Sequence, residues 1–255
     1  MSLVSNVTLL THLEGELALG EIVTASRYGV RAWVSERQGG VSSAPYASLN
    51  LASHVGDDPA SVKENRTRLA TALQVPPERL CFVNQVHGDA VAHARELTAH
   101  TDADALVGDD DFAVAVLVAD CVPLLLVNRQ THAFAVVHAG WRGLALGVIA
   151  RAAAALGPGP SLYAFVGPSI SVAAYQVGPE VASRFSHVPG AVVADHGDRS
   201  RLDLRAVSAH QLHQLGLDEA HVELSSAVTD GGDQYFSDRA QRPCGRFALI
   251  AKRAS

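Results

Sequence analysis

The sequence predicts an α/β or α+β fold organised as one compact unit. Short apolar runs rich in valine and alanine, typical of buried strands, alternate with segments of helical periodicity along the chain. No repeat and no long linker divides the 255 residues, and the GPGP loop at 157–160 is too short to separate domains. This length suits one large domain or two small ones, and the weak boundary signals favour a single domain spanning 1–255.

The first half of the chain contains three predicted elements. A helix is expected over residues 59–73, because Asp58 is a typical N-cap and Pro59 suits the first helical turn. One face of this helix carries the apolar side chains of Val62, Leu69 and Leu73. Residues 112–118 and 133–137 are apolar runs rich in valine and alanine, so both are predicted to be buried strands.

Two further helices and a strand are expected in the second half. The segment 144–156 has an apolar side chain at every fourth position and ends before a Gly-Pro pair. This stripe consists of Leu144, Val148, Ala152 and Leu156. A helix is also predicted over 204–215, with Asp203 near its start and Gly216 after its end. Residues 246–251 form the predicted closing strand.

Composition excludes several classes of partner. The formal net charge is -6 and the arginines are scattered, so neither a nucleic acid nor an acidic membrane is expected to bind. The most apolar stretch, 112–127, is interrupted by Asp120 and is shorter than the about 20 residues that span a bilayer. No cationic segment precedes the first apolar residues, and the three cysteines are far apart. We expect a cytoplasmic protein without disulfides, as a monomer or a weak homo-oligomer.

Cys121 is the first candidate for chemistry. A free cysteine is usually a small buried hydrophobe. Here Asp120 precedes it, and a carboxylate is costly to bury without partners. Pro123 follows it, and proline favours strand starts, edges and bulges. The DCVP segment is therefore predicted to interrupt a strand and to expose its polar groups.

Two histidines occupy comparable positions. His138 ends the apolar run AFAVVH and is followed by Ala-Gly, where no bulky side chain crowds the backbone. His87 lies in the polar segment NQVHG, with the amides of Asn84 and Gln85, just after the apolar run 80–83. A satisfied core histidine and a plain turn are the respective structural alternatives.

Together the thiol and the two imidazoles have the composition of a metal site. Zinc binds thiolate and imidazole readily, and three protein ligands leave a fourth position for water, as in catalytic zinc sites. The bound water would then be acidified toward neutral pH. The candidate ligands are His87, Cys121 and His138.

The segment GWRG at 140–143 lies between the strand predicted to end near His138 and the helix predicted over 144–156. A helix N-terminus offers free N–H donors, and Arg142 adds a planar, bidentate anion donor. Phosphate or another anion could therefore bind beside the metal. The alternative is a tight turn with Trp141 packed and Arg142 solvated.

These motifs resemble a family of bacterial proteins once called polyphenol oxidase or laccase-domain proteins. Its members are also described as purine nucleoside phosphorylase/adenosine deaminase, and some as peptidoglycan editing factors. The resemblance rests on NQVHG at 84–88, ADALV at 103–107, DCVP at 120–123 and HAGWRG at 138–143. It extends over most of the chain through RQGGVS at 37–42, LNL at 49–51, VGDD at 55–58, NR at 65–66, GPSI at 167–170, LDL at 202–204 and FS at 236–237.

The resemblance implies a single-domain α/β sandwich with mixed β-sheets flanked by helices. It implies zinc at the three candidate ligands, with copper as the alternative metal. The implied reactions are phosphorolysis of adenosine, inosine, guanosine and methylthioadenosine, and deamination of adenosine. The expected partners are therefore a purine nucleoside and phosphate. Departures from the family pattern lie mainly after Ile170, at Ala173-Ala174, Gln176, Val228 and Ala240, and also at Glu36.

The remaining expectations concern individual roles. We expect the substrate to be bound by Arg142, Gln85, Arg37 and Asn84. Asp120 or Asp104 would move protons, although Asp120 fits a structural acceptor equally well. Three alternatives stay open: copper-dependent phenol oxidation, a metal-free hydrolase in which His138 activates Cys121, and an editing factor that acts on cell-wall precursors.

Overall fold

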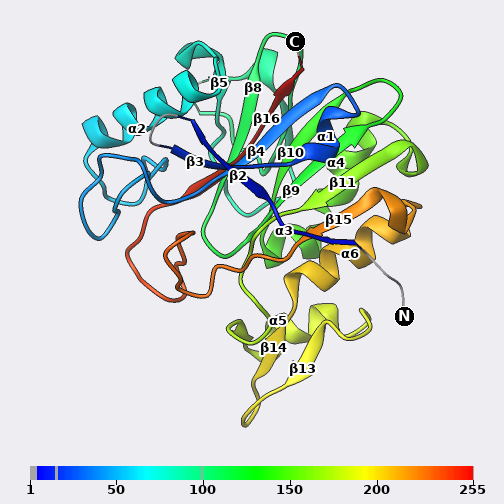
Figure 1. Ribbon diagram of the computed structural model, residues 1–255. Helices are drawn as coiled ribbons and strands as arrows, with labels where there is room; N and C mark the ends of the chain where they lie inside the picture. The colour runs from blue at the N-terminus through cyan, green and yellow to red at the C-terminus, as the bar shows by residue number, and fades with distance from the viewer. Residues whose placement is uncertain (1–4, 15–16, 99, 255) are drawn as a thin grey trace.

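The computed structural model describes residues 5–14, 17–98 and 100–254. Two large mixed β-sheets lie face to face in the centre of the molecule, and helices cover their outer faces (Figure 1). A small sheet of β12 (Gln176–Val177), β14 (Ser200–Leu202) and β13 (Val192–Ala194) projects to one side. The predicted layered α/β class, with mixed sheets flanked by helices, is confirmed.

The first large sheet has seven strands and contains parallel and antiparallel pairs. In spatial order they are β1 (Ser5–Val7), β15 (Val222–Ser225), β11 (Leu162–Val166), β9 (Val122–Asn128), β10 (Phe134–Ala139), β7 (Ala105–Val107) and β6 (Val91–His93). The predicted strand 133–137 is therefore confirmed as β10, which continues through His138 to Ala139.

The second large sheet has six strands. In order they are β2 (Leu10–Glu14), β3 (Leu17–Glu21), β4 (Val30–Ser35), β16 (Phe247–Arg253), β8 (Ala113–Val118) and β5 (Leu80–Cys81). The predicted strands 112–118 and 246–251 are β8 and β16. The last strand of the chain lies inside the sheet, because β16 pairs with β4 on one side and with β8 on the other.

The helices agree with the sequence at two of the three predicted places. They are α1 (Val23–Ser26), α2 (Pro59–Ala72), α3 (Trp141–Leu146), α4 (Val148–Leu156), α5 (Pro179–Ala182) and α6 (Leu204–Gln214), with short 3-10 turns at Pro77–Arg79, Ala94–Glu96, Gly159–Ser161, Ser183–Phe185 and Glu219–His221. The Asp58 carboxylate accepts from the main-chain N–H groups of Ala60 and Ser61 at the start of α2, as predicted. Asp203 caps α6 in the same way.

The single helix predicted over 144–156 is wrong. Two helices occupy this stretch, and α3 begins at Trp141, three residues earlier than expected. Gly147 separates α3 from α4 because its backbone has a left-handed φ of 89°, which glycine adopts at little cost. The apolar stripe is nevertheless buried as predicted, by Leu144, Val148, Ala152 and Leu156.

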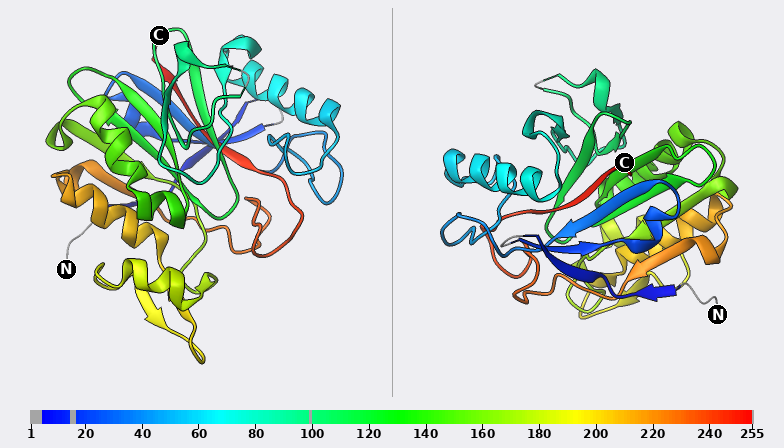
Figure 2. Two further views of the ribbon diagram at one scale, coloured as in Figure 1. Left: turned by 180° about the vertical axis from the view of Figure 1, so that it is seen from behind. Right: turned by 45° about the horizontal axis from the view of Figure 1, so that its top comes forward.

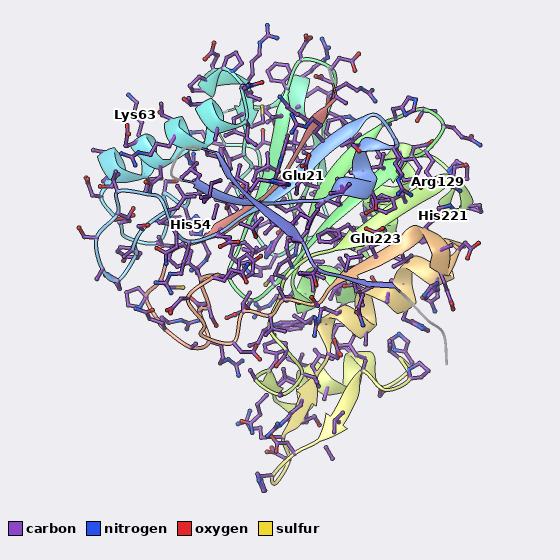
Figure 3. All side chains as sticks on the ribbon, in the orientation of Figure 1. Glu21, His54, Lys63, Arg129, His221 and Glu223 are labelled. Carbon is purple, nitrogen blue, oxygen red and sulfur yellow. The ribbon has the colours of Figure 1, made fainter. Side chains whose placement is uncertain are left out.

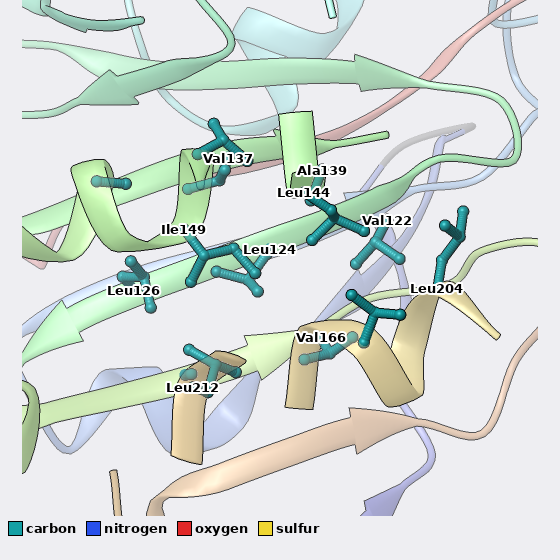
Figure 4. Close-up of a cluster of buried hydrophobic side chains, with 14 of the residues drawn as sticks. Val122, Leu124, Leu126, Val137, Ala139, Leu144, Ile149, Val166, Leu204 and Leu212 are labelled. Carbon is teal, nitrogen blue, oxygen red and sulfur yellow. The ribbon is translucent and has the colours of Figure 1, made fainter. Parts of the chain in front are cut away.

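Three hydrophobic clusters define the layers. The first lies between the seven-stranded sheet and helices α3, α4 and α6 (Figure 4). The second lies between the two sheets, and the third between the six-stranded sheet and α2. Successive side chains of β9 alternate between the first two clusters, since Leu124 and Leu126 face the helices while Leu125 and Val127 face the other sheet. Both faces are buried, which explains the uninterrupted apolar runs.

Figure 2 shows α2 on one side of the paired sheets and α4 with α6 on the other. No helix among the described residues has both the length and the apolar character that crossing a bilayer requires.

Replacement of Leu126 by alanine should lower the free energy of unfolding by about 2–5 kcal/mol, because its fully buried side chain fills the helix-facing cluster. Urea unfolding followed by circular dichroism measures this change. The matched control is Leu13→Ala on strand β2, whose side chain is 75% exposed and whose loss should cost less than about 0.5 kcal/mol. Equal losses for both variants would contradict the assigned layers.

Candidate functional site

The segment between β8 and β9 carries the chain from the six-stranded to the seven-stranded sheet. Asp120 turns this corner with a left-handed φ of 86°, and Cys121 follows it immediately before β9. The predicted interruption is confirmed at Asp120 and Cys121, whereas Val122 and Pro123, which were expected to belong to it, lie inside β9. The prediction that it exposes its polar groups is wrong for Asp120, which is buried.

Asp120 is buried because its carboxylate has partners. One oxygen accepts hydrogen bonds from the hydroxyls of Thr229 and Ser237, each at 2.7 Å. The other oxygen accepts from the main-chain N–H of Arg239 at 2.6 Å. These bonds offset the cost of removing the charge from water. They also tie the corner beside Cys121 to the segment that precedes β16.

His138 lies inside β10, where its neighbour across the ladder is Pro123 of β9. Its ring is buried rather than exposed at a strand end, and its Nδ1 donates to the Asp104 carboxylate at 2.7 Å. The other ring nitrogen, Nε2, remains available to face Cys121. The sequence placed the imidazole at the end of an apolar run but did not show that the strand continues past it.

His87 is exposed and has a left-handed φ of 59°. Its loop is held by the same Asp104 carboxylate, which accepts from the main-chain N–H groups of Val86 at 3.2 Å, His87 at 3.0 Å and Gly88 at 2.6 Å. One fully buried carboxylate therefore contacts the residues on both sides of the site.

The structure brings the three predicted ligand residues together. One ligand atom from each of His87, Cys121 and His138 lies within 4.8 Å of the others, and no other such group of histidines, cysteines and acids occurs among the described residues. The two imidazole rings meet edge to face, with centroids 4.7 Å apart. A tetrahedral zinc ion holds its ligand atoms about 3.3–3.8 Å apart, so small side-chain movements would close this set around a metal.

Gly140 keeps the space beside these atoms open. A Cβ at this position would lie 3.0 Å from Cys121 Sγ and 3.1 Å from Cδ2 of His87. Both separations are shorter than ordinary contacts, so a larger residue would displace the ligands. The glycine after the strand is thus required by close approach to the site.

The electrostatics of the site favour a thiolate. Burial opposes ionisation of Cys121, but the facing imidazole of His138 and hydrogen bonds from both histidines outweigh it and lower the pKa of the thiol to about 6. Burial likewise opposes charge on His138, yet the Cys121 thiolate and the Asp104 carboxylate raise its pKa to about 9. Without a bound metal the pair is a thiolate beside an imidazolium at neutral pH.

The three residues open onto a cavity of about 840 Å³. Its wall carries more positive than negative charge, with Arg142, Arg239, Arg242 and Arg246 against Asp120 and Asp238. Asp238 pairs with Arg242 and Arg246. The guanidinium of Arg142 lies over the ring of Trp141 at 4.5 Å, and that of Arg239 lies over Tyr175 at 5.1 Å. These two cations have no carboxylate partner among the ion pairs of the described residues, so they suit a bound anion.

The predicted substrate-binding residues divide into two groups. Arg142 and Gln85 line the cavity, but the Gln85 amide is engaged with the main chain of Leu117 through two bonds of 2.7 Å. Asn84 and Arg37 lie outside the lining. Asn84 donates to Asp102, and the Arg37 guanidinium donates twice to the carbonyl of Ala47. Both side chains therefore have structural partners where the sequence suggested a ligand.

Sequence reasoning missed much of the cavity wall, including three of its basic or titratable residues. His54, labelled in Figure 3, comes from the loop between β4 and α2, while Arg242 and Arg246 precede β16. Burial, followed by the charges of Arg246 and Arg66, lowers the pKa of His54. The VGDD motif that follows His54 belongs to the family pattern and was the available signal for this loop.

Comparison with known proteins gives a consistent result. Residues 31–253 match the family model described as multi-copper polyphenol oxidoreductase laccase. A Mycobacterium tuberculosis H37Rv protein named purine nucleoside phosphorylase is 38% identical over 229 residues, covering 87% of this chain and 91% of the relative. Purine nucleoside phosphorylase YfiH of Escherichia coli K12 is 37% identical over 226 residues, covering 86% and 92%.

Solved structures share the whole fold. Neisseria meningitidis protein NMB0706 superposes with a TM-score of 0.84 at 32% identity, covering 98% of this chain and 100% of its own. YlmD from Geobacillus stearothermophilus superposes with a TM-score of 0.85 at 27% identity, covering 97% and 100%. The resemblance drawn from the motifs is thereby confirmed.

In metal-free protein, Cys121 should be alkylated by iodoacetamide at neutral pH, because the thiolate is the reactive form. The pKa of this thiol is lowered to about 6, so the thiolate stays populated down to about that pH. The rate of alkylation should fall below that pH, in proportion to the fraction of Cys121 that is thiolate. Cys81 and Cys244 are internal controls, since burial raises the pKa of both thiols. Peptide mapping that finds the three cysteines equally unreactive at neutral pH would contradict the ion pair.

Proposed function

The chain belongs to the multi-copper polyphenol oxidoreductase laccase family, and from this premise we propose that it is a zinc-dependent purine nucleoside phosphorylase that also deaminates adenosine. The proposed substrates are adenosine, inosine, guanosine and methylthioadenosine, each with phosphate. We place the activity in one domain of a cytoplasmic protein, a monomer or weak homo-oligomer with neither nucleic-acid nor membrane partners.

One observation carries this proposal. A thiol and two imidazoles meet within 4.8 Å on the wall of a cavity that also presents two arginines without carboxylate partners among the described residues. The donor set suits zinc, and the arginines suit phosphate. A phenol oxidase would need no anion subsite. A nucleoside phosphorylase needs both a nucleoside pocket and a place for phosphate.

Phosphorolysis transfers the sugar from purine to phosphate. A phosphate oxygen attacks the anomeric carbon, the bond from that carbon to the purine nitrogen breaks, and the purine leaves with the electron pair and takes up a proton. When bound, zinc supplies a Lewis acid and an acidified water, the latter being what deamination requires.

The cavity arginines would orient the phosphate. Each guanidinium already rests on an aromatic ring, Arg142 on Trp141 and Arg239 on Tyr175, so little side-chain freedom is lost on binding. Arg239 is further fixed by the bond from its main-chain N–H to Asp120. Both arginines thus meet an anion in a preformed geometry.

The two buried carboxylates have positioning roles in this scheme. Asp120 and Asp104 each accept several hydrogen bonds from the protein, which leaves neither one free to exchange protons with a substrate. His54 is the remaining cavity histidine outside the ligand set, and its lowered pKa keeps it neutral at physiological pH. A neutral imidazole can accept a proton but cannot supply the one that the leaving purine takes up, so we assign this side chain a hydrogen bond to the purine, and the purine takes its proton from water.

Purified protein should contain about one zinc per chain, and Cys121→Ala should lose both the metal and the release of adenine from adenosine and phosphate. Metal analysis combined with chromatographic detection of adenine, hypoxanthine and inosine tests both statements. Cys81→Ala is the matched control, because Cys81 lies on β5 outside the cavity lining and should keep zinc and activity. Full zinc occupancy in Cys121→Ala would overturn the ligand assignment.

Arg142→Ala should raise the KM for phosphate about 10- to 100-fold, which corresponds to the loss of about 1.5–3 kcal/mol for a charged hydrogen bond. Deamination of adenosine uses no phosphate, so it should fall much less in the same variant. Arg184→Ala is the control, since Arg184 is exposed and outside the cavity lining. Equal losses in both reactions of Arg142→Ala would show that the arginine supports the site generally.

A further inference from the structure

We propose that Asp104 is the positioning residue that assembles the metal-ligand set before a metal arrives. This inference rests on the proposed function for its ligands, His87, Cys121 and His138, but concerns a residue outside that set. Asp104 is fully buried and does not line the cavity. It acts through the two histidines.

The register of the seven-stranded sheet places Asp104 beside His138. Ala105, the first residue of β7, pairs with Val137 of β10, so Asp104 immediately before β7 lies next to His138. The main-chain N–H of His138 donates to the Asp104 carbonyl at 2.7 Å, and its Nδ1–H donates to the carboxylate at the same distance. A carboxylate that accepts from Nδ1–H keeps the proton on that nitrogen and fixes the direction of the ring, so Nε2 is the nitrogen that faces the site and gives up its proton when a metal binds.

The same carboxylate fixes the loop of the second histidine. Three consecutive main-chain N–H groups, those of Val86, His87 and Gly88, point at the two oxygens of Asp104. His87 adopts a left-handed φ of 59° in this loop, a conformation that non-glycine residues hold only when their surroundings impose it. The carboxylate thus holds a less favourable backbone in place and aims the exposed imidazole at Cys121.

Only a carboxylate satisfies this arrangement. Four N–H donors converge on Asp104, and both of its oxygens are acceptors. Asparagine has the same shape but one acceptor oxygen, so its NH2 group must face at least one N–H donor. Asp104→Asn should therefore lose either the hydrogen bond that orients the His138 ring or one of the bonds that hold the His87 loop. Because the two side chains have nearly the same shape, the substitution leaves no cavity.

The first experiment measures metal binding by competition with a chelator and by the spectrum of the cobalt-substituted protein. Asp104→Asn should weaken zinc binding about 10- to 100-fold and alter the thiolate-to-cobalt charge-transfer band. Asp102→Asn is the matched control, because among the described residues this exposed carboxylate two positions away bonds to the Asn84 side chain alone, so its loss should change neither readout. Wild-type affinity and spectrum in Asp104→Asn, or equal changes in Asp102→Asn, would overturn the proposal.

The second experiment needs no variant. In metal-free wild-type protein, the amide protons of Val86, His87 and Gly88 should already be protected from hydrogen exchange, and zinc should add little protection. Rapid exchange that slows only when zinc is added would show that the metal orders the loop, and would overturn the proposal even if Asp104→Asn does not fold. Failure of wild-type protein to bind zinc would instead refute the proposed function.

Discussion

The passage from β8 to β9 moves the chain from one sheet into the other, and the buried carboxylate of Asp120 holds this crossing together. The carboxylate accepts from Thr229, Ser237 and the main-chain N–H of Arg239, and the main-chain carbonyl of Asp120 accepts from the N–H of Ile170. An unpaired carboxylate could not be buried at this corner, so the two sheets close here only with those donors in place. The thiol of Cys121 and the main chain of Arg239, both in the cavity wall, are consequently positioned by one group.

Elements whose sequence contains its own start and stop signals could be predicted closely. The helices α2 and α6 each begin after an aspartate cap and differ from the predicted ranges by one residue at their ends. The break at Gly147 could not be predicted from the stripe, because residues four apart face the same sheet whether the helix is continuous or interrupted. The strands β1 to β4 were missed because their mixed apolar and polar residues give no clean period of two, although β3 and β4 are largely buried.

The grouping of the three candidate metal ligands could be predicted, because a thiol and imidazoles that end or follow apolar runs are rare and chemically distinctive. Their supporting residues were not, since hydrogen-bond partners far apart in the chain appear only in the fold. Arg37 illustrates the limit: an arginine in a glycine-rich motif has the same sequence signature whether it binds phosphate or a carbonyl. Here it binds the carbonyl of Ala47, and its guanidinium lies 4.8 Å from the Phe236 ring. It thereby shapes the loop that delivers His54 to the cavity.

The family description names copper, whereas the donors of this chain favour zinc. A blue-copper centre has two imidazoles, one thiolate and usually a weak axial methionine, and a multicopper oxidase needs further histidine clusters. The sequence has one methionine, Met1, which lies outside the described residues, and the described residues form one suitable cluster. The cavity beside that cluster is lined by arginines that add nothing to electron transfer from a phenol. In the proposed reaction they would neutralise the phosphate that attacks a sugar carbon, so the charge of the wall and the donor set support the same proposal.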